Sequence, residues 1–201
     1  MGAMVDGYLG RLPNGIASYP EVVVKGSVIR SSTENLPDGA TTLSTGMPEI
    51  DALVTDPPAV SAWVPQVHHC LLLASIYDRF FSVAGGQTDF DAWVYERNRR
   101  LFRSPLYKVL FAVVSPERLV VGLANRWAAF RRGVAIEIVE QRSSSGILAL
   151  RYPPHIMDAL TLRGIAVALR AGLDAGGAEQ AIVTVTEPGP TEARFAVRWR
   201  G

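Results

Sequence analysis

The sequence predicts an α+β fold, in which a helical N-terminal part packs on an antiparallel sheet with a C-terminal β-β-α-β-β unit. Three observations predict this class. Helix-period segments dominate up to residue 133, two hairpin patterns follow, and an alanine-rich helical segment separates the hairpins. With 201 residues, of which 48% are hydrophobic, the chain is long and apolar enough for one packed core.

The N-terminal part begins with weak patterns. Residues 1–20 contain no basic segment followed by an apolar core, so we expect a flexible N-terminal segment without a secretory signal, and one domain over residues 21–201. Residues 21–32 are rich in β-branched side chains and predict a strand. The Pro- and Gly-rich residues 33–46 predict a loop, and residues 47–54 a short helix.

The strongest helix pattern of this half starts at Pro65, which suits the first helical position, and continues to about Phe81. Leu71 and Leu72 lie toward its polar side, so the helix is apolar around most of its girth. Such a helix is central to a core or is covered by a partner subunit.

Three further helices are expected, each introduced by a Ser or Thr that can act as N-cap. They span residues 88–102, 104–114 and 115–132, with Thr88, Ser104 and Ser115 as caps and Arg131, Arg132 and then Gly133 at the end of the third.

The last third of the sequence predicts two hairpins around one helix. Residues 134–141 and 147–152 alternate between apolar and polar side chains across a Ser/Gly turn, which indicates the first hairpin. After two prolines a helix is expected over residues 155–177. Residues 181–187 and 193–199 alternate again, across a Pro/Gly turn, and form the second hairpin.

Charge is unevenly distributed along a chain whose net charge is only +1. Residues 97–132 carry nine basic residues and one acidic residue, Glu117, whereas the other residues carry 11 basic and 18 acidic ones. This asymmetry predicts either a surface for anions or, as we favour, a basic segment that docks on the acidic remainder of the chain. Arg99 and Arg103, at helical i,i+4 spacing, are the candidate anion-binding pair.

The motifs of common enzyme classes are absent from the sequence. It contains no glycine-rich phosphate loop, no G-x-S-x-G elbow and no H-E-x-x-H. The single cysteine, Cys70, excludes an intrachain disulfide and a cysteine-based zinc cluster, so we expect no metal site and a cytoplasmic protein. No apolar stretch is long enough to span a membrane. The sequence therefore favours a non-catalytic protein, with an enzyme of unrecognised type as the weaker alternative.

Five residues are candidates for contact with a ligand: His69, Cys70, Trp63, Tyr77 and Trp127. His69 lies at the edge of the apolar helix face, where it is an axial haem ligand, a polar anchor for a ligand, or a buried histidine bonded to a carbonyl. Cys70 is a small core residue or a thiol facing a ligand; burial would raise its pKa and make it a poor nucleophile. The tryptophans are core or interface anchors.

Four segments carry a resemblance to known families: VVVKGSVIRS, SAWVPQVHHCLLLASIYDRF, RSPLYKVLFAVVSPERLVVGLANRWAAFRRG and RFAVRW. Together they resemble an uncharacterised paralogous family expanded in myxobacteria. At a coarser level their order is similar to that of haem-nitric-oxide-binding and vinyl-reductase-like sensory domains. That resemblance implies helices and a sheet that enclose a ligand pocket. The Tyr-x-Ser-x-Arg motif for haem propionates is absent, so the cofactor is unknown.

The sequence favours two functions. The first is a sensory or binding module that encloses an apolar small molecule, motivated by the apolar composition and the resemblance. The second is a homodimeric or signalling interaction module that uses helix faces, motivated by Leu71 and Leu72. Nucleic-acid binding is a fourth and weaker option, because no tryptophan is spaced as a stacking platform for bases.

Overall fold

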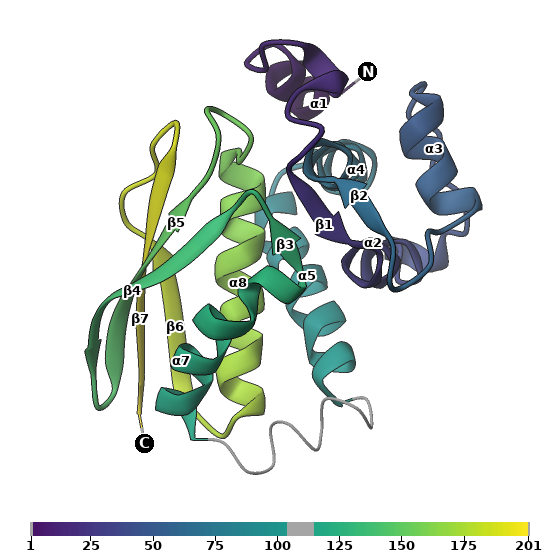
Figure 1. The fold of residues 1–201 in the computed structure, drawn as a ribbon. Coiled ribbons are helices and arrows are strands. Elements are labelled where there is room, and N and C mark those ends of the chain that lie inside the picture. The colour runs from purple at the N-terminus through teal and green to yellow at the C-terminus, as the bar shows by residue number, and fades with distance from the viewer. Residues whose placement is uncertain (1, 104–114, 201) are drawn as a thin grey trace.

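The computed structural model describes residues 2–103 and 115–200. Figure 1 shows helices gathered around the N-terminus on one side and an antiparallel sheet on the other, with helix α8 lying along the sheet. The predicted α+β class is confirmed. The helices are α1 (Ala3–Leu9), α2 (Gly26–Thr33), α3 (Pro48–Thr55), α4 (Gln66–Phe80), α5 (Gly86–Arg103), α7 (Pro116–Arg126) and α8 (Ala159–Ala175), with 3-10 turns η1 (Gly15–Ala17), η2 (Pro37–Gly39) and η3 (Trp127–Ala129).

The larger sheet contains the two predicted hairpins, in the order β4-β5-β7-β6 with every pair antiparallel. Its strands are β4 (Ala135–Arg142), β5 (Ser145–Arg151), β6 (Glu179–Val185) and β7 (Glu192–Arg200). Leu148 pairs with Phe195 and Leu150 with Ala193, and all four are buried. Helix α8 packs against β6 and α5, so it covers one face of the sheet and joins it to the helical part.

A second, small sheet pairs segments that are far apart in the sequence. Strand β1 (Val23–Lys25) lies between β2 (Trp63–Pro65) and β3 (Arg131–Arg132). The strand predicted over residues 21–32 is therefore wrong beyond Lys25, because Gly26 begins α2. A Cβ on Gly26 would lie 2.1 Å from the carbonyl oxygen of Ala59, so glycine permits this close approach.

Two predicted helix boundaries are corrected first. Helix α5 begins at Gly86, not at Thr88. A Cβ on Gly86 would lie 1.7 Å from the carbonyl oxygen of Phe81, so only glycine fits at this position. The helix expected over residues 115–132 does open at Ser115 and Pro116 but ends at Arg126, since Arg131 and Arg132 pair with β1. The helix predicted over residues 104–114 lies outside the described residues.

The last helix also starts later than predicted. His155 does not begin it, because its φ of 62° is left-handed. Instead Asp158 is the N-cap of α8: its carboxylate accepts a 2.7 Å hydrogen bond from the backbone N–H of Thr161.

Helix α4 lies at the centre of the helical part, as its apolar girth predicts. Leu71 and Leu72 are fully buried within this chain. Residues 1–20, expected as a flexible segment, include α1, which packs on α4 and buries Tyr8. No helix among the described residues is long and apolar enough to cross a membrane.

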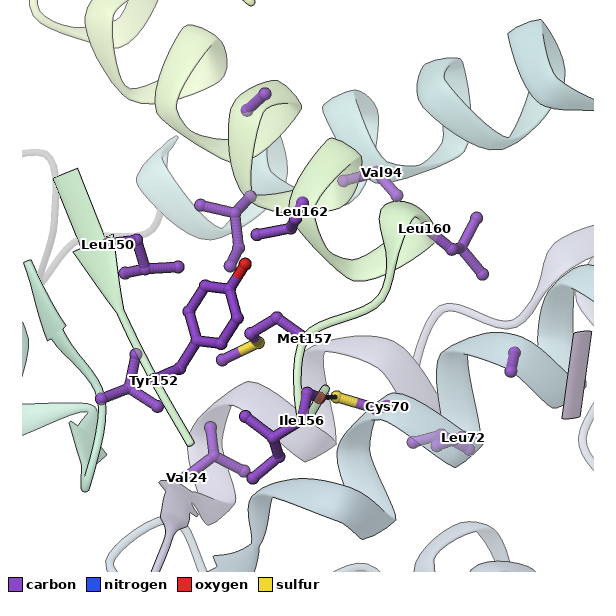
Figure 2. Packing of buried hydrophobic residues seen from close by; sticks show 14 of the residues in the cluster. Val24, Cys70, Leu72, Val94, Leu150, Tyr152, Ile156, Met157, Leu160 and Leu162 are labelled. Atoms are coloured by element: carbon purple, nitrogen blue, oxygen red, sulfur yellow. Dashed lines mark hydrogen bonds between the residues drawn. The ribbon is translucent and has the colours of Figure 1, made fainter. Parts of the chain in front are cut away.

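One hydrophobic core joins the helices to the sheet. Figure 2 shows Ile156 and Met157, from the segment before α8, packed between Cys70 of α4 and Leu150 at the end of β5. The thiol of Cys70 donates to the carbonyl of Ile156 over 3.4 Å. The segment that leads into α8 therefore contacts both α4 and the larger sheet, directly before Asp158 caps the helix.

We expect Asp158→Ala to lower the free energy of unfolding by about 1 kcal/mol, because the N–H of Thr161 loses its acceptor inside the fold. Asp158→Asn, which keeps a capping oxygen, is the matched control and should stay within about 0.5 kcal/mol of the wild type. Urea unfolding measures both values. Equal losses in the two variants would show that the cap contributes nothing.

Candidate ligand-binding cavity

A cavity of about 470 Å³ lies between helices α5, α7 and α8 and the inner side of the larger sheet. This volume falls within the range of small-molecule sites. Most of its wall is apolar, and each of these helices and two strands of the sheet contribute to it. The apolar residues include Val94 and Leu101 from α5, Val120 from α7, Ile165 from α8, Leu148 from β5 and Val197 from β7.

Gly164 widens the cavity in the middle of α8. The residue is buried, and yet a Cβ placed on it would find no atom of another element within 4 Å. The helix therefore presents its bare backbone to the cavity at this point. A larger side chain at Gly164 would enter the cavity without a clash at its first atom.

Three charged or titratable side chains with buried positions line the same cavity: His69 from α4, Arg97 from α5 and Arg131 from β3. Neither ring nitrogen of His69 has a hydrogen-bond partner among the described residues. Burial, and then the charges of Arg131 and Arg97, lower the pKa of His69 well below its ordinary value. The imidazole is therefore neutral at physiological pH and has one donor and one acceptor available.

Arg97 carries a buried positive charge, and its hydrogen bond and ring contact among the described residues come from neutral groups. Its Nη1 donates a 2.5 Å hydrogen bond to the hydroxyl of Ser32, and its guanidinium lies 4.8 Å from the ring centre of Trp93. Its Nε is buried without a partner among the described residues. Burial, followed by the charge of Arg131, lowers the pKa of Arg97 to about 10, which still leaves it charged at pH 7.

Arg131 is held in a similar way. Its Nη1 donates to the side-chain oxygen of Gln66, and its guanidinium lies 5.5 Å from the ring centre of Trp127. Burial lowers the pKa of Arg131 to about 10 as well. Within residues 2–103 and 115–200, neither Arg97 nor Arg131 forms an ion pair with a carboxylate. The cavity wall thus contains two buried, uncompensated cations.

Of the five predicted ligand contacts, the cavity brings together His69 and Trp127. Cys70 is buried beside it, and burial raises the pKa of the thiol, which makes it a poor nucleophile. Tyr77 packs its ring against Phe90 at 5.5 Å. Trp63 lies in β2 outside the cavity wall.

The ring of Trp63 makes cation–π contacts with two basic side chains. Lys25 Nζ lies 4.0 Å and the guanidinium of Arg132 lies 4.1 Å from the ring centre.

The two arginines predicted to bind an anion, Arg99 and Arg103, do not line this cavity. Arg99 pairs with Glu96 at 2.9 Å on the surface of α5, and Arg103 is exposed at the end of that helix. An anion site at this pair stays a prediction.

Sequence reasoning missed Arg97 and Arg131. For Arg97 a signal exists: Phe90, Val94, Arg97 and Leu101 follow the i, i+4, i+7, i+11 spacing of one helix face, so the arginine interrupts an apolar stripe. For Arg131 the predicted helix placed the residue in a solvated last turn, and only pairing with β1 reveals its buried side.

No protein-family model matches this sequence, and no curated protein does. Similar solved structures are H-NOX proteins. The Fe(II) unliganded H-NOX protein from K. algicida has a TM-score of 0.56 and 12% sequence identity, over 88% of this chain and 97% of that chain. A Cs H-NOX variant with 4-cyano-L-phenylalanine at site 5 has a TM-score of 0.55 and 9% identity, over the same shares of the two chains. The likeness confirms the expected architecture of helices and an antiparallel sheet at the level of fold, and the resemblance to a myxobacterial family stays a prediction.

The H-NOX fold implies haem, but the described residues of the cavity do not fit a haem held through His69. Arg131 and Arg97 disfavour positive charge on this imidazole, and the same repulsion opposes an iron cation bound to it. A metal-ligating histidine also needs an acceptor for its second nitrogen, and neither nitrogen of His69 has one among the described residues. Nor do three His, Cys, Asp or Glu side chains of the described chain gather into a metal site.

We expect the buried neutral state of His69 to make the fold sensitive to acid. Because its pKa is lowered in the folded state, the unfolded chain binds a proton first as the pH falls below about 6.5, and folding stability is then lost. The loss approaches about 1.4 kcal/mol per pH unit until the folded-state pKa is reached.

His69→Leu removes this titration, so its free energy of unfolding should fall less than that of the wild type between pH 7 and pH 5. Urea unfolding at a series of pH values measures the difference. His68, whose pKa burial also lowers, is present in both proteins and cancels. Parallel pH profiles would contradict the neutral, buried histidine.

Proposed function

We propose that this chain is a non-catalytic sensory or binding module that encloses a small molecule with an apolar body in the cavity between α5, α7, α8 and the sheet. One observation carries the proposal: a 470 Å³ cavity with a mostly apolar wall, into which buried polar side chains also face. Pockets with this combination, apolar walls and a few placed polar groups, are typical of small-molecule sites.

The chemistry of the wall favours binding over catalysis. His69 is neutral, and its ring makes no hydrogen bond to a described carboxylate that would orient it as a general base. The thiol of Cys70 donates to a backbone carbonyl, and burial raises its pKa, so it is held as a thiol.

The position of the cavity suits a sensor. Its wall combines helices of the N-terminal part, α4 and α5, with α8 and the inner strands of the β-β-α-β-β unit. A ligand that contacts both parts favours one relative packing of them, which is how binding shifts a conformational equilibrium. Cytoplasmic location belongs to the same proposal.

The alternative, a homodimeric interaction module, loses the feature that motivated it. Leu71 and Leu72 are buried inside this chain, and so they present no face to a partner. The exposed large hydrophobic residues of the described chain, such as Val60 and Val83, are scattered over separate elements.

A substitution that fills the cavity tests this proposal. Gly164→Leu places a side chain in open space within the cavity, so we expect it to abolish binding of an uncharged apolar probe, decanol, measured by isothermal titration calorimetry. The same change should raise the free energy of unfolding by about 0.8 kcal/mol, because leucine replaces glycine inside a helix.

Gly7→Leu is the matched control: Gly7 is exposed on α1, and its Cβ also meets nothing within 4 Å. It should bind decanol as the wild type does. Wild-type protein that binds neither decanol nor a charged ten-carbon analogue, or a Gly164→Leu variant that binds decanol with unchanged affinity, would exclude this cavity as the site.

A further inference from the structure

The polar end of the cavity has an unusual charge balance. Arg97 and Arg131 come from different elements, are about nine-tenths buried, and both line the cavity. Burying an ion costs several kcal/mol unless an opposite charge and hydrogen bonds offset it. Their hydrogen-bond partners among the described residues, the hydroxyl of Ser32 and the amide oxygen of Gln66, are neutral and offset only part of this cost.

Both guanidinium groups remain protonated at physiological pH. The pKa of each guanidinium stays near 10, several units above physiological pH, even though burial lowers it. His69, the third buried group at this end, is neutral and supplies no negative charge. A molecule that enters the cavity therefore meets a fixed positive potential beside these groups and a mostly apolar wall elsewhere, which also includes the exposed Arg118 and Arg126.

We propose that the ligand of this cavity is an aliphatic carboxylate, with its head accepting hydrogen bonds from Arg97 and Arg131 and its hydrocarbon chain along the apolar wall. This inference rests on the proposed function and names the class of molecule that the same site binds.

The chemistry and the size both favour this class. Guanidinium groups bind carboxylates through planar pairs of hydrogen bonds, whereas a cationic ligand would add a third positive charge and an uncharged one would leave both charges uncompensated. At about 30 Å³ for each non-hydrogen atom, a cavity of about 470 Å³ has room for about 16 such atoms, so a ten-carbon carboxylate fits inside it. Leu101, Val120 and Ile165 provide the apolar contacts for that chain.

The first experiment compares three probes that share one alkyl chain: decanoate, decanol and decylamine. Isothermal titration calorimetry of the full chain at pH 7 should give the tightest binding for decanoate, at least tenfold tighter than decanol, and the weakest for decylamine. Equal affinities for decanoate and decanol would overturn the inference and leave the proposed function intact. Binding of none of the three would instead remove the proposed function.

The second experiment removes one charge. Arg97→Met should weaken decanoate binding about tenfold to a hundredfold and leave decanol binding unchanged, because only the carboxylate pairs with the guanidinium. Thermal unfolding should show no loss of stability, since replacing an uncompensated buried charge with an apolar side chain of similar length removes a desolvation cost.

Two controls separate ligand binding from a structural role. Arg99→Met, on the same helix but paired with Glu96 at the surface, should change neither binding nor stability appreciably. Arg97→Lys keeps the charge and should retain part of the preference for decanoate. An Arg97→Met variant with a lowered melting temperature and unchanged decanoate affinity would overturn the inference, and Arg131→Met provides the same comparison from β3 if the first variant does not fold.

Discussion

The side chain of Gln66, fully buried at the start of α4, connects the parts of this fold. Its oxygen accepts from Arg131, its Nε2 donates to the thiol of Cys70 over 3.2 Å, and that thiol donates in turn to the carbonyl of Ile156. Tyr8 of α1 donates to the same carbonyl over 2.8 Å. One buried polar chain therefore runs from β3 through α4 to the segment before α8. Because a buried amide must satisfy its hydrogen bonds, this chain fixes where the guanidinium of Arg131 lies.

The small sheet β2-β1-β3 supplies the backbone for this arrangement. Val24 pairs with Val64 on one side and with Arg131 on the other, so residues from three distant parts of the sequence lie on adjacent strands. Gly133, whose φ is 75°, turns the chain directly afterwards into β4 and the larger sheet. The helical part and the β-β-α-β-β unit are thus tied together at one edge, and the cavity lies where their other surfaces face each other.

The elements predicted correctly from the sequence are those with strong local patterns. The hairpins alternate with period two, and α7 has Ser115 at its N-cap position and Pro116 as its first residue, as the sequence predicts. The failures occur where tertiary contacts override local propensity: Gly26 ends a strand pattern because the chain passes close to Ala59, and Arg131 leaves a helix pattern to pair with β1. For the cavity, the sequence indicated His69 and Trp127, but that no described carboxylate pairs with Arg97 depends on three-dimensional packing that no spacing rule contains.

Two locally unfavourable choices coincide at this cavity. Glycine in the middle of α8 costs about 1 kcal/mol relative to alanine, although Gly164 contacts nothing that requires a missing side chain. Arg97 and Arg131 are buried without a described carboxylate partner, although apolar side chains would be less costly there. Each choice taken alone weakens the fold; among the described residues, neutral partners offset only part of the cost of the two arginines, and nothing offsets that of the glycine. The proposed ligand would account for both: Gly164 leaves room for its body, and the two guanidinium groups would provide a counter-charge for its head. Departures from local stability rules that converge on one cavity are typical of a functional site, which is why the cavity, and not the better-packed surroundings of Cys70, is the place to look for a ligand.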